Sequence, residues 1–157
     1  MIEKIHNTDR GAIHYWISDR MNRQDISLIF LPGLTADHRL FDRQIAYFEG
    51  RYNVFVWDAP GHASSLPFEL NFSLMDKAGW LEAIFKKEGI DRPVIVGQSM
   101  GGYVGQAYAE LYPAKLAGFI AIDSAPLQRS YVTGAEVLLF TRMYGVYREV
   151  TGHSWRN

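Results

Sequence analysis

The chain has no cysteine, no long apolar run and no excess of charge of one sign. Without cysteine there are no disulfides and no thiolate metal ligands. The 16 Lys and Arg residues offset the 17 Asp and Glu residues without forming blocks, so we expect no binding to nucleic acid or to an anionic membrane. No segment approaches the roughly 18 apolar residues of a membrane span, and the N-terminus lacks a signal-peptide core. We therefore expect a cytoplasmic protein.

Metal and phosphate motifs are also missing. There is no His-Glu-x-x-His pattern, and the glycine-rich segment at 97–102 lacks the Lys-Ser/Thr pair of a phosphate-binding loop. The sequence therefore predicts neither a metal site nor a bound cofactor.

Apolar runs typical of buried strands alternate with helical patterns along the chain. The 157 residues, 48% of them hydrophobic and 21% charged, suffice for one globular domain. The predicted strands are 11–18, 26–31, 52–57, 93–96 and 116–122, and the predicted helices are 38–49, 74–88 and 100–112. His6 and His14 fall in the early strands. This alternation predicts an α/β fold with a mostly parallel sheet and flanking helices.

A Gly-x-Ser-x-Gly motif lies between a predicted strand and a predicted helix. It consists of Gly97-Gln98-Ser99-Met100-Gly101. This context predicts a nucleophile elbow, a sharp turn that presents the serine hydroxyl at the top of a sheet. The two glycines leave room for the tight backbone. A serine that merely caps the following helix is the alternative interpretation of Ser99.

Two further motifs follow the preceding strands in the order expected for a known family. They are Leu31-Pro32-Gly33-Leu34 and Asp58-Ala59-Pro60-Gly61-His62-Ala63-Ser64-Ser65. Together with the elbow, they make the chain resemble the α/β-hydrolase superfamily, in particular its small serine esterase-like members with a lid. The resemblance covers the N-terminal portion of such proteins. It implies a core at 1–125, the start of a lid at 126–157, and a fold lacking the family's last two strands and C-terminal helices.

The resemblance also assigns roles to individual residues. It implies that Ser99 is the nucleophile and that the backbone N–H groups of Met100 and Leu34 form the oxyanion hole. Gly33, Gln98 and Tyr103 are the implied contacts to a small-molecule acyl substrate.

The sequence departs from the family pattern at two positions. Pro32 stands where a histidine often braces the oxyanion loop, and Ala63 replaces a common glycine. The first change removes a bracing side chain but not the backbone donor. Neither departure excludes activity.

The acid and base of a catalytic triad are not evident. In this fold the acid and then the histidine follow the serine along the chain. Asp123 follows the last predicted strand and is a candidate acid, with turn formation before Pro126 as the alternative. Only His153 follows Ser99, and a solvated tail position suits it better than a catalytic role.

The histidines before Ser99 are interpreted as structural. His62 belongs to the Pro-Gly-His turn. His38 either lines the mouth of the pocket or begins a surface helix. Without a base, the chain by itself is expected to hydrolyse esters slowly or not at all.

Three functions remain open from the sequence. The first is a serine hydrolase acting on carboxylic esters or related acyl compounds. The second is a non-catalytic truncated homologue or interaction module, and the third is a C–C hydrolase, lyase or cofactor-free haloperoxidase of the same fold. Fluorophosphonate labelling of Ser99 would distinguish the first two.

The apolar strand 116–122 and the broadly apolar segment 134–150 predict an interaction surface. An uncharged edge strand tends to pair with another chain. We expect self-association, or a partner that covers both segments.

Overall fold

The computed structural model describes residues 1–19, 21–22 and 26–126 of the chain. The chain divides after Ser124 into two units, and the second, Ala125–Asn157, lies almost entirely outside the described residues. The predicted lid at 126–157 and the segment 134–150 therefore fall outside this description. Their boundaries and structure stay predictions.

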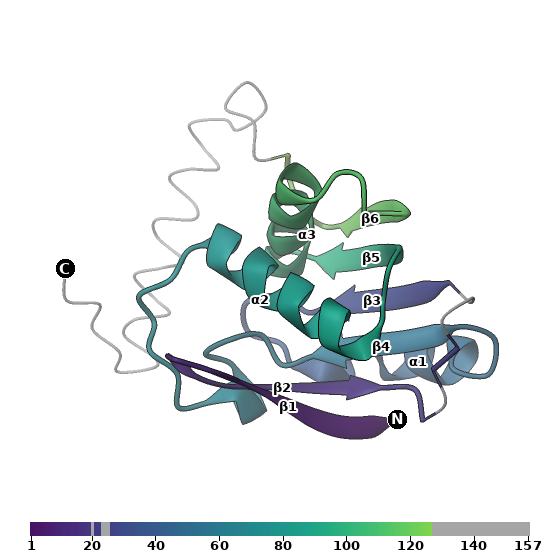
Figure 1. The fold of residues 1–157 in the computed structure, drawn as a ribbon, viewed down its shortest axis with the longest axis horizontal. Coiled ribbons are helices and arrows are strands. Elements are labelled where there is room, and N and C mark those ends of the chain that lie inside the picture. Colours follow the sequence, from purple (N-terminus) through teal and green to yellow (C-terminus); the bar gives the residue numbers. More distant parts are fainter. Residues whose placement is uncertain (20, 23–25, 127–157) are drawn as a thin grey trace. The chain divides into compact units, whose positions relative to one another are not determined.

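A six-stranded sheet with the order β1-β2-β4-β3-β5-β6 forms the centre of the first unit (Figure 1). Its strands are β1 (Ile2–Thr8), β2 (Gly11–Ile17), β3 (Ser27–Leu31), β4 (Asn53–Trp57), β5 (Pro93–Gln98) and β6 (Gly118–Ile122). Strands β4, β3, β5 and β6 run parallel, whereas β1 and β2 are antiparallel to their neighbours. The α/β fold is thus confirmed, with a mixed sheet. Only two residues join β1 to β2, and a connection this short allows only an antiparallel hairpin.

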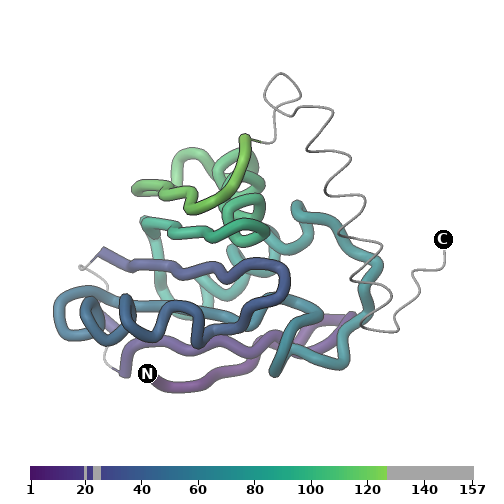
Figure 2. The backbone as a smooth tube through the Cα atoms, turned by 180° about the vertical axis from the view of Figure 1, so that it is seen from behind, coloured from purple at the N-terminus to yellow at the C-terminus, as the bar shows by residue number. Residues whose placement is uncertain are grey.

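Helices cover both faces of the sheet. Figure 1 shows α2 (Leu74–Glu88) and α3 (Met100–Leu111) on one face, and Figure 2, from behind, shows α1 (Asp42–Phe48) on the other. The predicted helix at 38–49 is a 3₁₀ turn, η1 (His38–Phe41), followed by α1, and a second 3₁₀ turn is η2 (Ala63–Ser65).

Strand β4 contributes side chains to two hydrophobic cores, one on each face of the sheet. Its alternating side chains place Phe55 and Trp57 in the core under α2 and α3, and Val54 and Val56 in the core under α1. All four are almost completely buried. A strand buried on both faces explains the continuous apolar run in the sequence.

A capping box begins α2. The Ser73 hydroxyl accepts from the Asp76 N–H at 3.2 Å, and the Asp76 carboxylate accepts from the Ser73 N–H at 2.7 Å. Gly89, with φ 71°, ends the helix in the left-handed region. These caps fix which residues of α2 face the sheet.

The topology gathers the three motifs at one edge of the sheet. Because β3, β4 and β5 are parallel neighbours, the loops after their carboxyl ends lie together, where α/β sheets place ligand sites. At one side of the sheet, β6 exposes Ile120 and Ile122 (51% and 42% exposed). What covers them stays a prediction. Within the described residues, no helix is long and apolar enough to cross a bilayer.

Candidate active site

Ser99 occupies a strained backbone conformation between β5 and α3. Its φ is 50° and its ψ is −116°, a combination that costs a non-glycine residue free energy. The Ser99 N–H donates to the Ile122 carbonyl at 2.9 Å, and its own carbonyl accepts from the Gly102 N–H at 2.9 Å and the Ser124 hydroxyl at 2.7 Å. These bonds tie the turn to the end of β6 and hold the serine in this conformation.

Two glycines permit the turn, as the motif predicts. A Cβ added at Gly101 would lie 2.5 Å from the Leu31 carbonyl carbon and would overlap its oxygen. A Cβ at Gly97 would lie 2.5 Å from the Gly101 carbonyl carbon. Both contacts are with backbone atoms. A side chain at Gly101 therefore fits only if α3 moves away from β3, and a side chain at Gly97 fits only if β5 and α3 move apart.

The oxyanion-loop segment lies directly against the elbow. A Cβ at Gly33 would lie 3.3 Å from the Ser99 Cβ and would overlap the Gln98 amide. Met100 is the first residue of α3, so its N–H has no acceptor within the helix. Within the described part of the chain, the Leu34 N–H has no acceptor either. The structure thus brings the predicted donors and contacts together around Ser99, although their roles stay predictions.

Tyr103 and Asp123 lie on either side of the elbow. Tyr103 is half-buried in the first turn of α3, where its N–H donates to the Ser99 carbonyl at 3.3 Å. Asp123 is exposed, with φ 52°, directly after the β6 residue that holds the Ser99 N–H. In residues 1–19, 21–22 and 26–126, no histidine is hydrogen-bonded to Ser99 or to Asp123. His153 lies outside those residues, so the triad assignment stays open.

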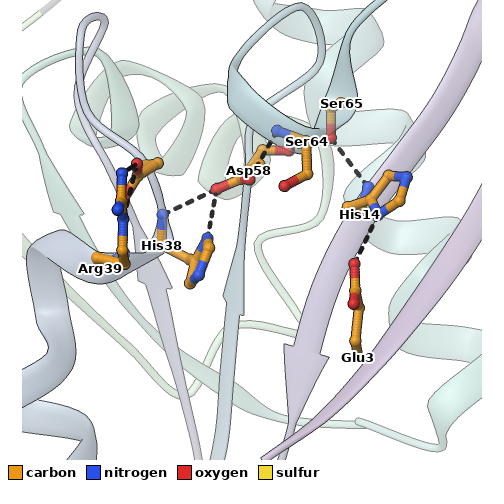
Figure 3. Close-up of polar contacts among 8 residues, drawn as sticks. Glu3, His14, His38, Arg39, Asp58, Ser64 and Ser65 are labelled. Atoms are coloured by element: carbon orange, nitrogen blue, oxygen red, sulfur yellow. Dashed lines mark hydrogen bonds and ion pairs between the residues drawn. The ribbon is translucent and has the colours of Figure 1, made fainter.

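The sequence did not reveal the pairing of Asp58 with His38. Asp58, completely buried after β4, accepts from the His38 N–H at 2.8 Å, and one of its oxygens lies 2.9 Å from the His38 Nδ1 (Figure 3). Its other oxygen accepts from the Ser64 N–H at 3.0 Å. The His38 ring stacks on Trp16 with centroids 3.7 Å apart. His38 is therefore a carboxylate partner that joins the loops after β3 and β4, and the adjacency of these strands is the signal that would have suggested it.

The backbone of the same turn is also hydrogen-bonded. The Ser65 hydroxyl donates to the Asp58 carbonyl at 2.7 Å and accepts from the His14 N–H at 2.9 Å. Ala63 has φ 41°, a left-handed conformation that glycine adopts more easily.

His62 and Lys77 have buried nitrogen atoms, and Lys77 contacts the elbow through Met100. The His62 Nδ1 lies 3.2 Å from the Pro60 carbonyl, and its Nε2 is buried with no partner among the described residues. Burial, and secondarily the charge of Lys77, lowers the pKa of His62. The Lys77 ammonium donates to the Met100 Sδ at 3.2 Å, and burial lowers its pKa to about 8. The sequence did not single out Lys77, because its position between apolar helix residues predicts only packing.

No metal site is apparent near these groups. Within the described residues, no three His, Cys, Asp or Glu side chains cluster as metal ligands would.

Comparison with known proteins places the chain in a family. Residues 26–143 match the α/β hydrolase fold family. The 3-oxoadipate enol-lactonase 2 of Acinetobacter baylyi is 33% identical over 63% of this chain and 37% of its own length. A 2-hydroxy-6-oxononadienedioate/2-hydroxy-6-oxononatrienedioate hydrolase of a Pseudomonas species is 24% identical over 88% of this chain and 49% of its own length.

Solved structures agree on the fold. A carboxylesterase structure from Nitrososphaera gargenis has a TM-score of 0.76 and 16% identity, covering 91% of this chain and 52% of that one. The chain thus spans between about a third and a half of the length of the relatives it matches. It belongs to the α/β-hydrolase family.

Proposed function

We propose that the chain carries the nucleophile half of a serine hydrolase that acts on carboxylic esters or related acyl compounds. The observation that carries this proposal is the backbone of Ser99, held at positive φ between β5 and α3. Strain of this kind persists only where the surrounding structure enforces it, and it is concentrated at functional sites. A serine serving only as a helix cap would need no such strain, and its side chain makes no cap hydrogen bond here.

The chemistry follows from what surrounds the serine. The Ser99 Oγ attacks the acyl carbon, and the carbonyl oxygen takes up the negative charge. The N–H groups of Met100 and Leu34 are available to donate to this oxygen, and the N-terminus of α3 adds partial positive charge. Loss of one such donor typically lowers the rate by roughly 10²–10³-fold.

The proton of Ser99 needs an acceptor before the hydroxyl is an effective nucleophile. Within the described residues, no basic side chain is hydrogen-bonded to Ser99. We therefore expect this chain alone to show little or no ester turnover while keeping a pre-shaped nucleophile. The relatives are named as a lactonase, a dienedioate hydrolase and carboxylesterases, which supports hydrolysis over lyase or haloperoxidase chemistry.

A fluorophosphonate probe tests the nucleophile without requiring turnover. The Ser99 Oγ forms a bond to phosphorus, fluoride leaves, and the hydroxyl proton passes to solvent. Because no base is paired with Ser99 among the described residues, we expect slow formation of one adduct on the full chain, located on Ser99 by peptide mass spectrometry and absent from Ser99→Ala. Ser64→Ala, which alters an exposed serine in a neighbouring loop, should label like the wild type.

One result would contradict the proposal, and another would contradict only the expected lack of turnover. Folded protein that leaves Ser99 unlabelled would favour the non-catalytic interpretation. Rapid hydrolysis of p-nitrophenyl esters, lost in Ser99→Ala, would instead show that the chain contains a base.

A further inference from the structure

Lys77 is a buried charge that has no counter-charge among the described residues. Four charged side chains are almost completely buried among the described residues: Asp58, Lys77, Glu82 and Glu88. Glu88 pairs with Lys4 and the Tyr15 hydroxyl. Asp58 pairs with His38, and Glu82 with Lys115 and the Tyr108 hydroxyl. Lys77 forms no ion pair with any described carboxylate.

The surroundings of the Lys77 ammonium cannot neutralise it. Its hydrogen-bond acceptor is the Met100 thioether at 3.2 Å, and the ring centroid of Phe72 lies 5.2 Å away. Sulfur is a weak acceptor, and an aromatic face stabilises a cation only modestly. Burying a charge with such partners is costly, so this position calls for an explanation beyond packing.

The ammonium contacts the side chain of the residue that follows the proposed nucleophile. Met100 follows the nucleophile, is half-buried and begins the 12-residue helix α3. A full positive charge and a helix N-terminus therefore meet at Met100. This arrangement favours an anion.

The charge persists at neutral pH. Burial lowers the pKa of Lys77 to about 8, so most molecules still carry the ammonium at pH 7. A carboxylate is the anion that an acyl substrate can itself carry, and a single ammonium can form a charge-assisted hydrogen bond with it. The Met100 side chain has three rotatable bonds and can move aside to admit such a group.

We propose that Lys77 recognises a carboxylate carried by the acyl substrate, so that the preferred substrates are half-esters or lactones of dicarboxylic acids. This inference rests on the proposed function, because it places the reacting carbonyl at Ser99. Lys77 determines specificity and takes no part in bond making.

Boronic acids test the inference without a catalytic base. The Ser99 Oγ donates a lone pair to boron and loses its proton to solvent, giving a tetrahedral boronate that ¹¹B NMR detects. The full chain is titrated with 3-carboxyphenylboronic acid and with its uncharged 3-carbamoyl analogue. We expect the carboxylate to bind about tenfold more tightly, as a charge-assisted hydrogen bond allows.

Two lysine variants provide the contrast. Lys77→Met should bring the affinity ratio of the two compounds close to one while the protein stays folded. Lys86→Met changes an exposed lysine on the same helix, with 70% of its side chain exposed, and should keep the wild-type ratio. Equal binding of the two compounds by the wild type, or a preference that survives in Lys77→Met, would overturn the inference.

A second signal separates failure of the subsite from failure of the nucleophile. Glutarate should shift the NMR signal of the Met100 methyl group in the wild type and in Ser99→Ala, but not in Lys77→Met. Absence of any boronate adduct together with this shift would reject the proposed nucleophile and retain the carboxylate site. Adducts with both compounds, with no preference for the carboxylate and no shift of the Met100 methyl signal, would reject the carboxylate site and retain the proposed nucleophile.

Discussion

The elbow at Ser99 follows β5 and the turn at Asp58 follows β4, so both lie at the same edge of the sheet. Their polar groups nevertheless differ in how they are hydrogen-bonded. Asp58 is completely buried and its carboxylate accepts from His38 and Ser64. At the elbow, the Ser99 side chain caps nothing and the Leu34 N–H has no acceptor within the described residues. Since buried polar groups are normally paired, the turn is suited to hold loops and the elbow to receive a ligand. Four substitutions probe this contrast.

The largest effect is expected where the elbow is tightest. Gly101→Ala would push a methyl group into the Leu31 carbonyl, so α3 must move away from the end of β3. We expect a loss of about 4 kcal/mol or more in the free energy of unfolding, or no soluble protein. Chemical denaturation followed by circular dichroism measures it.

Gly79→Ala is the matched control, because Gly79 also lies in a helix and nothing is within 4 Å of an added Cβ. It should gain about 0.5–1 kcal/mol. Similar stability of the two variants would show that the elbow tolerates a side chain after all.

The second effect tests whether the Asp58 turn depends on its carboxylate. Asp58→Asn replaces a charged acceptor with an amide that turns one N–H₂ group toward the donors of His38 or Ser64. We expect a loss of about 2–3 kcal/mol, measured by urea denaturation.

Asp37→Asn is the comparison, since Asp37 forms an exposed pair with Arg39. Asparagine keeps its helix-capping role, so a loss under about 1 kcal/mol is expected. An equal cost at both aspartates would mean that burial adds nothing at Asp58.

The third effect concerns strain at the nucleophile. Ser99→Gly relieves the positive φ and should raise stability by about 1–2 kcal/mol while abolishing fluorophosphonate labelling. Ser99→Ala keeps the strain and should change stability by less than about 0.5 kcal/mol, again without labelling. Thermal unfolding of the two variants separates strain from chemistry. A Ser99→Gly protein no more stable than Ser99→Ala would show that the turn is not strained.

The sequence allowed much of this edge to be predicted, because local signals are strong there. Residues close together in the chain are enough to predict the strand before Gly97 and the glycines of the elbow. The mixed sheet was less evident, since the pairing of β2 with β4 joins residues far apart in the chain.

Contacts between loops were the least predictable. His38 and Asp58 are twenty positions apart and meet only because β3 and β4 are neighbours. Lys77 is harder still, because its neighbour Met100 lies on another helix and lysine on a mostly apolar helix face has no distinctive pattern. Side-chain pairing across elements depends on three-dimensional placement that periodicity does not encode.

The smallest effect concerns the one strained residue of the Asp58 turn. Ala63 has φ 41° in an exposed 3₁₀ turn, and Ala63→Gly should raise stability by about 0.5–1 kcal/mol, less than Ser99→Gly. Ala114 is an exposed turn residue whose φ is not positive, so Ala114→Gly should not increase the stability of the protein. Labelling of Ser99 should stay unchanged in Ala63→Gly, because this strain positions no reacting group. If Ala63→Gly slowed labelling of Ser99, the conformation of the turn at Asp58 would have to influence the elbow. The distinction between a turn that only joins loops and an elbow that carries the nucleophile would then be wrong.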